Sequence, residues 1–256
     1  MLLPPLPVEI KAHIFSLTGD WQLARLSSEF FWTIAPQLLR TTCVGPLLDD
    51  APDRSLPTQL IQLYPACGHL VENLTIELHN SSMLIVGLFL QAFPKIRRLR
   101  HLTISYTAEV GSHWSILSLP YLDLLEDVIS ASPNLTRLTF NHTQPTSLLI
   151  FACADTLTRL DLGYIFNPFG KFSIPLTHNL EVLSLTPQAA NFFIGNPPAT
   201  LRVLIIEKDH FDDCFITDSL RAFINSCTSV RRVGIVDFGI GMLFFFFSFI
   251  AYLLLF

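Results

Sequence analysis

The sequence predicts an α/β protein in three parts: a short N-terminal helical unit, a repeat array with a parallel sheet, and a hydrophobic C-terminal segment. Three observations carry this prediction. Residues 1–40 contain three short amphipathic patterns, residues 71–237 repeat a six-residue apolar motif, and residues 238–256 contain no charged side chain. Apolar residues three and four apart are typical of helices, whereas motifs that recur along a chain are typical of stacked structural repeats.

The N-terminal unit is predicted from its helix-starting residues. Pro7 opens the first amphipathic pattern, because its fixed φ suits the first turn of a helix, and Ile10 and Ile14 then fall on one face. Asp20 and the serines at 27–28 can cap a second and a third short helix. A unit of about 40 residues buries too little surface to be stable alone. It is therefore expected to pack on the rest of the chain or on a partner.

The same segment resembles an F-box, particularly of the fungal type, over residues 2–40. The matching residues are the string Leu6-Pro7-Val8-Glu9-Ile10 and the stretches 14–17, 20–26 and 30–40. In F-box proteins, the Leu-Pro entry and the apolar positions after it bind the Skp adaptor, which joins the protein to a cullin-RING ubiquitin ligase. The resemblance implies a Skp-binding surface formed by Leu6, Pro7, Ile10, Ile14, Leu23 and Leu26.

An alternative interpretation of this segment is that its helices cap one end of the repeat array. A cap buries its apolar face against the array, whereas an F-box keeps that face exposed for its partner. The exposure of these apolar side chains therefore distinguishes the two interpretations.

The repeat motif is an apolar residue, two variable residues, an apolar residue, one polar residue and another apolar residue. Seven copies begin at positions 71, 99, 135, 157, 180, 201 and 230. Their middle apolar residues are 28, 36, 22, 23, 21 and 29 residues apart, and most of these gaps lie in the range of about 20–29 residues of leucine-rich repeats. The motif thus resembles the leucine-rich repeats that commonly follow an F-box and select the substrate. The alternative is an ordinary α/β domain whose strands begin with Leu-x-x-Leu.

Each copy predicts one strand with inward apolar residues, and a helix or loop that returns the chain. Helices are predicted at 82–93, 121–131, 146–154 and 218–227. The asparagine expected three positions after each motif is absent, so only weak side-chain ladders are expected. The variable positions should form a concave, mixed-charge face for a protein partner. The target-binding candidates are Arg100, Arg137, Arg159, Glu181 and Arg202.

Two further segments complete the chain. Turn-forming residues predict a linker at 41–70. The tail at 238–256 is 19 residues long, close to the ~20 that a membrane-spanning helix needs. Arg231 and Arg232 precede it on the side that the positive-inside rule leaves in the cytosol. The alternatives for the tail are a structural closing element and the translation of a noncoding, T-rich stretch.

Composition narrows the function. Half of the 256 residues are hydrophobic and the net charge is -5 without a basic block, so nucleic acid is not expected as a partner. No phosphate-binding loop, nucleophile elbow or His-Glu-x-x-His helix is present, so the chain is predicted to have no catalytic residue and no enzymatic activity. The five scattered cysteines form no C-x-x-C pair, so neither a metal site nor a cofactor is expected.

The N-terminus has no basic region before its apolar residues, so it is not a typical signal peptide. A cytoplasmic or nuclear location is expected, with the tail as an alternative membrane anchor that leaves the rest in the cytosol. Together these features predict a substrate-recognition adaptor of a Skp-cullin-F-box ubiquitin ligase. Its partners would be the Skp adaptor, through it a cullin, and an unidentified substrate protein. The alternative is a leucine-rich repeat scaffold without a ligase role, with or without a membrane anchor.

Overall fold

The protein has mixed α/β structure built on one large, mainly parallel sheet. In the computed structural model, the residues described are 7, 9–10, 32, 35–37, 39–44, 65–78, 96–106, 119–141, 143, 147–163, 174–194, 197–208, 218–237 and 242–246.

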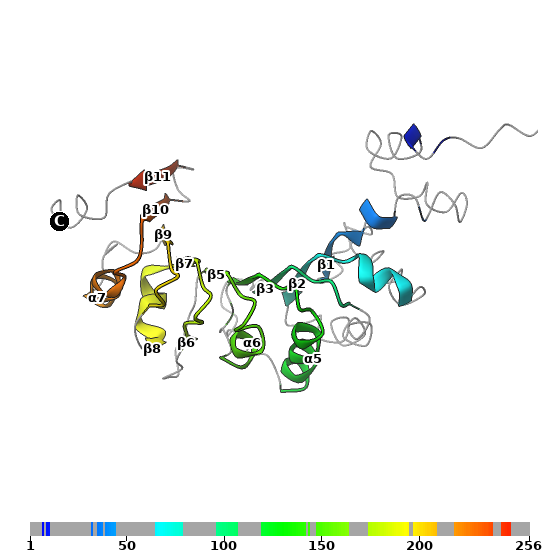
Figure 1. Ribbon diagram of the computed structural model, residues 1–256, viewed down its shortest axis with the longest axis horizontal. Helices are drawn as coiled ribbons and strands as arrows, with labels where there is room; N and C mark the ends of the chain where they lie inside the picture. The colour runs from blue at the N-terminus through cyan, green and yellow to red at the C-terminus, as the bar shows by residue number, and fades with distance from the viewer. Residues whose placement is uncertain are drawn as a thin grey trace, which may run out of the picture.

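The sheet has nine strands within these ranges, and they lie side by side nearly in chain order. The strands are β1 (Thr41–Val44), β2 (Asn73–Leu78), β3 (His101–Tyr106), β4 (Arg137–Asn141), β5 (Arg159–Leu162), β7 (Val182–Leu185), β9 (Val203–Lys208), β10 (Arg232–Asp237) and β11 (Met242–Phe246). The first eight are parallel, and β11 is antiparallel to β10. Figure 1 shows the strands along an arc with the helices on its outer side.

The strands share one register, which a repeated backbone contact sets. The carbonyl of Arg100, just before β3, accepts hydrogen bonds from the N–H groups of Thr136 and Arg137 at 2.9 and 3.1 Å. The same forked contact occurs between every two neighbours among the eight parallel strands. Its acceptors are Arg40, Glu72, Arg100, Thr136, Thr158, Glu181 and Arg202. Equivalent motif positions therefore stack in columns across the sheet.

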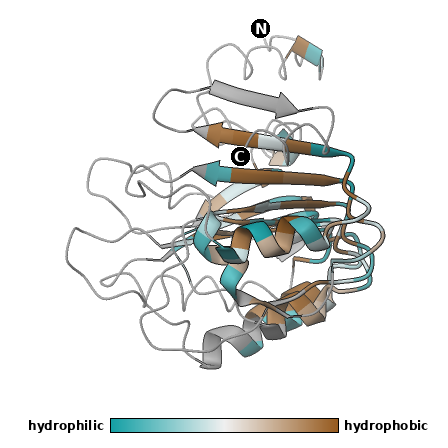
Figure 2. Ribbon diagram, turned by 90° about the vertical axis from the view of Figure 1, so that its left-hand side faces the viewer, coloured by the Kyte–Doolittle hydropathy of each residue, from teal (hydrophilic) through white to brown (hydrophobic). Residues whose placement is uncertain are grey.

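The apolar motif positions form the core on the outer side of the sheet. In the six copies that begin at 71, 99, 135, 157, 180 and 201, none of the three apolar side chains is more than 1% exposed. The last copy is looser, with Val230 at 7% and Val233 at 3%. Alternate residues of a strand point to opposite faces. The face away from the core is therefore polar on β2 to β5, whereas Val203 and Ile205 make it apolar on β9. Figure 2 shows strands that are hydrophobic along their length and hydrophilic at their ends. The predicted inward positions are thus confirmed.

Three predicted helices are present on the outer side: α5 (Leu119–Ser130), α6 (Ser147–Ala152) and α7 (Asp218–Ser226). Leu125, Val128 and Ile129 of α5 are buried at helical spacing, which joins the helix to the core. The helix predicted at 82–93 lies outside the described residues. A 3-10 helix, η3 (Pro65–Leu70), precedes β2.

Two of the returns show no α-helix among their described residues. Between β5 and β9 the chain forms the short strands β6 (Ile174–Pro175) and β8 (Phe193–Ile194), which pair in parallel, and the 3-10 helix η5 (Pro187–Phe192). The motif gaps here are 23 and 21 residues.

The sheet begins earlier in the chain than the motif predicts. Residues 41–44, predicted as part of a linker, form β1 and pair in parallel with β2. Leu39 and Thr42 occupy the first and middle motif positions, and both are fully buried. Residues 39–44 are thus an additional copy of the motif. It does not stand out as apolar in the sequence because its middle residue is threonine. The Thr42 hydroxyl donates a hydrogen bond to the Leu39 carbonyl at 2.9 Å, so this buried hydroxyl has a partner within the same segment.

The tail also differs from the helix predicted over 238–256. Its described residues form β11, which continues the sheet as an antiparallel neighbour of β10. Pairing with β10 gives these backbone groups hydrogen-bond partners in the sheet. Of the alternatives for the tail, residues 242–246 therefore match a structural element, although it is a strand and not a helix. In the part of the chain that the structure describes, no helix is long and apolar enough to span a bilayer.

The N-terminal unit is described at only a few positions. Residues 9–10, 32, 35–37 and 39 are helical. The second predicted helix and most of the first and third lie outside the described residues, so the three-helix unit stays a prediction. Ala35 and Leu39 are fully buried and belong to the same core as the motif residues. The end of this unit therefore packs on the β1 end of the sheet.

Candidate functional site

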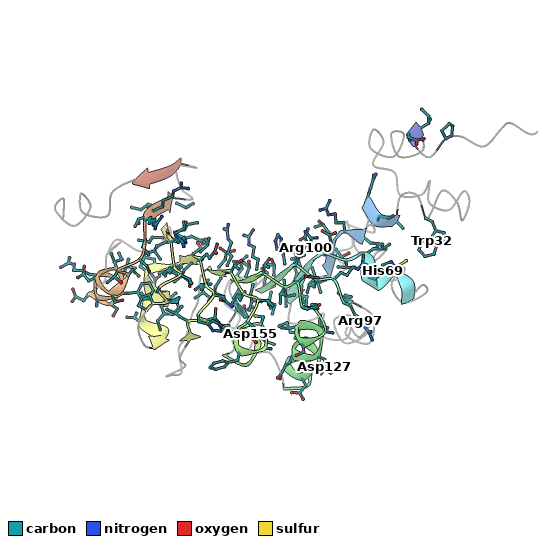
Figure 3. All side chains as sticks on the ribbon, viewed as in Figure 1. Trp32, His69, Arg97, Arg100, Asp127 and Asp155 are labelled. Carbon is teal, nitrogen blue, oxygen red and sulfur yellow. The ribbon has the colours of Figure 1, made fainter. Side chains whose placement is uncertain are left out.

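The open face of the sheet carries the polar motif positions. Figure 3 shows Arg100 on this side, whereas Arg97, Asp127 and Asp155 lie on the side of the helices. The stacked register places His101, Arg137 and Arg159 in one column at the start of β3, β4 and β5. Thr139, Asp161 and Ser184 form a second column two residues further along β4, β5 and β7.

Asp161 is the centre of this face. Its Oδ2 accepts a hydrogen bond from Arg137 Nε at 2.7 Å, and its Oδ1 accepts one from Arg159 Nε at 2.9 Å. The Thr139 hydroxyl adds a third donor at 3.2 Å. We call Arg137, Thr139, Arg159 and Asp161 the Asp161 cluster. Adjacent strands in exact register bring these side chains together.

The cluster is a buried carboxylate beneath two partly exposed cations. The Asp161 side chain is 6% exposed, against 37% for Arg137 and 36% for Arg159. A buried charge is tolerated when it is paired and hydrogen-bonded, and the aliphatic parts of arginines cover polar groups well. Both arginines contact Asp161 through Nε, so the outer nitrogens of each guanidinium take no part in these contacts. The pair is held in place and can still bind an anion.

A second carboxylate lies near the cluster. The Ser184 hydroxyl donates a hydrogen bond to Glu207 Oε1 at 2.5 Å, linking β7 to β9. Burial raises the pKa of Glu207, and the hydrogen bond from Ser184 partly opposes that shift. Repulsion from Asp161 raises the pKa further, whereas Arg159 and Arg137 lower it.

The raised pKa of Glu207 predicts a pH-dependent effect on stability. Because the folded state binds this proton more tightly than the unfolded chain does, its stabilising effect is present at low pH and is lost as the pH rises through the raised pKa. Glu207→Gln should therefore raise the melting temperature at pH 7, by about 1–3 °C. The gain should shrink toward pH 4, and Asp123→Asn, at an exposed carboxylate on α5, should show neither effect. A gain that is equal at both pH values would contradict the assignment.

The pKa of His101 reflects the charges that surround it on the open face. Burial lowers its pKa, and the positive charges of Arg137, Arg159 and Arg100 lower it further, against an opposing effect of Asp161. The neutral imidazole is therefore favoured in the folded protein. The arginines thus outweigh the carboxylates at this point.

All five predicted target-binding residues lie at the amino-terminal edge of the strands. Arg137 and Arg159 are the first residues of β4 and β5. Arg100, Glu181 and Arg202 each come just before a strand and are exposed. Arg100 Nε also lies 3.8 Å from Oε2 of Glu72, and Arg40 Nε lies 3.1 Å from the same oxygen. The sequence did not single out Asp161, Thr139, Ser184 or Glu207 as a unit. Aligning the copies would have indicated that Thr139, Asp161 and Ser184 occupy the same motif position.

No protein-family model matches this sequence, and no curated protein shows a significant match to it. The chemistry of the face is therefore inferred from its own residues.

The predicted Skp-binding residues are described only in part. Pro7 is exposed, and Ile10 is 45% exposed on a helical segment. Leu6, Ile14, Leu23 and Leu26 lie outside the described residues.

Metal and nucleophile chemistry find little support in the described segments. Among them, no group of three histidine, cysteine or acidic side chains could hold a metal ion. Cys67, Cys153 and Cys227 are buried, and burial raises the pKa of Cys153 and of Cys227 to about 12. Such thiols remain protonated and unreactive near neutral pH. Among the described residues, the open face of the sheet is the candidate site.

Proposed function

We propose that this chain is a substrate-recognition adaptor of a Skp-cullin-F-box ubiquitin ligase. The N-terminal unit would bind the Skp adaptor, and the open face of a leucine-rich repeat array would bind the target protein. One observation carries the proposal: eight parallel strands in one register have an apolar face under helices and an open face that is polar from β2 to β5. A regular, extended face of this kind is suited to a protein partner.

Side-chain hydrogen bonds between neighbouring copies support the repeat interpretation. Thr143, at the position expected for asparagine, donates a hydrogen bond to the Ile104 carbonyl of the preceding copy at 3.5 Å. On the turns that lead into the strands, Asn179 Nδ2 donates to the Asp155 carbonyl and the Thr200 hydroxyl donates to the His178 carbonyl, each at 2.7 Å. Neighbouring copies are thus connected at both ends of their strands, although the expected asparagine is absent.

The division of exposure in the N-terminal unit supports docking to a partner. Ala35 and Leu39 are buried in the shared core, whereas Pro7 and Ile10 are exposed. An exposed isoleucine on a short helical segment is suited to an apolar pocket of another protein. The unit thus has one end attached to the sheet and an apolar residue available to the Skp adaptor.

The Skp interaction predicts a specific loss of binding. Ile10→Asp should abolish co-purification with a co-expressed Skp adaptor, because a carboxylate cannot enter an apolar interface without losing its hydration. The matched control is Phe151→Asp, which changes a side chain that is 62% exposed on α6. That variant should co-purify with the adaptor as the unchanged chain does.

The result also tests the alternative of a scaffold without a ligase role. The burial of Ala35 and Leu39 in the shared core is what a capping unit would show as well. Retention of the Skp adaptor by Ile10→Asp, or its absence from the unchanged chain, would reject the ligase proposal. A point substitution is preferable to removing residues 1–40, because Leu39 belongs to the core.

A further inference from the structure

Seven arginines from distant parts of the sequence lie along one edge of the sheet. They precede or begin β1, β3, β4, β5, β9 and β10. We call them the arginine row: Arg40, Arg100, Arg137, Arg159, Arg202, Arg231 and Arg232. Arg231 and Arg232, which the sequence suggested as the flank of a membrane anchor, join the row through hydrogen bonds from their N–H groups to the Arg202 carbonyl at 2.9 and 3.1 Å.

The row is a positive strip on a chain whose net charge is -5. At the same edge, Glu72 and Glu181 precede strands, and Asp161 lies between Arg137 and Arg159. Glu207 lies near the Asp161 cluster as well. Seven arginines against these four carboxylates leave a net charge of about +3 along the row. The helix side, in contrast, exposes charges of both signs, among them Asp123, Asp127, Asp155, Arg97 and Arg221.

We propose that the arginine row binds an acidic, carboxylate-rich peptide segment of the target protein, with one carboxylate over the Arg137–Arg159 pair. This inference rests on the proposed function, because it specifies what the open face binds. Guanidinium groups bind carboxylates through paired, charge-assisted hydrogen bonds. The two arginines are already positioned by Asp161, so less side-chain entropy is lost on binding.

The dimensions of the row fit an extended peptide. Adjacent strands lie about 4.8 Å apart, so the eight parallel strands extend for roughly 34 Å. A fully extended chain spans at most about 3.3–3.6 Å per residue, so some ten residues reach from end to end. A peptide can also place neutral residues opposite Glu72 and Glu181. A nucleic acid carries a charge at every phosphate and would meet repulsion there.

A direct binding assay with the full chain tests the proposal. The probe is a fluorescent twelve-residue peptide with glutamate at alternate positions, and its control has glutamine at the same positions. Anisotropy at low salt should show the glutamate peptide binding at least tenfold more tightly, with a preference that weakens as salt is added. Equal binding of the two peptides would overturn the proposal.

Matched variants locate the binding. Arg100→Gln with Arg202→Gln removes two exposed charges of the row and should weaken the glutamate peptide about fivefold. Arg97→Gln with Arg221→Gln removes two exposed charges outside the row and should change affinity less than twofold. Equal losses in the two variants would reject the row as the site.

Two further binding measurements complete the test. The triple variant Arg137→Met, Arg159→Met and Asp161→Asn removes the central pair without leaving a buried charge, and should weaken binding about tenfold. A twelve-nucleotide oligo-dT should bind more weakly than the glutamate peptide; tighter binding would make the row a nucleic-acid face and overturn the proposal. Loss of peptide binding leaves Skp co-purification unaffected, so the failure of this inference is distinct from the failure of the ligase proposal.

Discussion

Replacing Phe140 with alanine should lower the free energy of unfolding by about 3–5 kcal/mol. Phe140 is the largest fully buried side chain among the described residues, and it lies on β4, near the middle of the sheet. Truncation removes the aromatic ring from the core and leaves a cavity that the neighbouring strands cannot fill, because their backbones are held by the sheet. Chemical denaturation followed by circular dichroism measures the change.

Phe151 provides the control for this effect. It lies eleven residues further along the chain on α6 and is 62% exposed. Phe151→Ala removes the same ring from a position that is largely in water, so the free energy of unfolding should change by less than about 0.5 kcal/mol. A loss below about 1 kcal/mol for Phe140→Ala, or an equal loss for both variants, would contradict the packing described for β4.

Removing both arginines that bind Asp161 should lower the free energy of unfolding by about 3–5 kcal/mol. In the variant Arg137→Met with Arg159→Met, methionine keeps much of the apolar contact of each side chain but donates no hydrogen bond. Asp161 is 6% exposed. Of its hydrogen bonds from described side chains, it would keep the one from Thr139. An unpaired buried charge is among the most destabilising features a point change can create.

A third substitution separates the charge from the packing. Adding Asp161→Asn to the methionine pair removes the unpaired charge and leaves an amide oxygen that still accepts the hydrogen bond from Thr139. Most of the lost stability should return, as a double-mutant cycle on the same denaturation curves would show. If the triple variant is no more stable than the double, the loss came from packing, and Asp161 does not depend on its arginines.

The burial pattern was predictable because it is encoded locally. A copy such as Leu135-x-x-Leu138-x-Phe140 places apolar residues on one side of a strand through the two-residue alternation of β-structure, and these side chains are buried. Helices α5, α6 and α7 were predictable for the same reason, from their own periodicity. The first strand was missed because Thr42 holds the position that leucine or valine holds elsewhere. Its hydrogen bond to Leu39 becomes visible only in the folded chain.

The candidate site shows where local patterns stop being informative. Arg137, Arg159 and Asp161 were all recognisable as variable motif positions, and the edge that collects Arg100 and Arg202 follows from the same spacing. Their contacts were not recognisable, because a shift of one residue between β4 and β5 would separate Arg137 from Asp161. The basic character of the edge was hidden for a related reason. Its arginines are far apart in sequence, and the net charge of -5 describes the whole chain.

The amino-acid pattern alone specified where the seven motif strands form, which of their side chains are buried and which are variable, since each of these depends on neighbours within a few positions. The register of eight strands, the pairing of Asp161 with two arginines and the gathering of the arginine row depended on the folded chain. Returns of unequal length, with motif gaps from 21 to 36 residues, have to bring every copy back to the same level. That alignment is set by hydrogen bonds between strands and by the shared core, which no single copy contains.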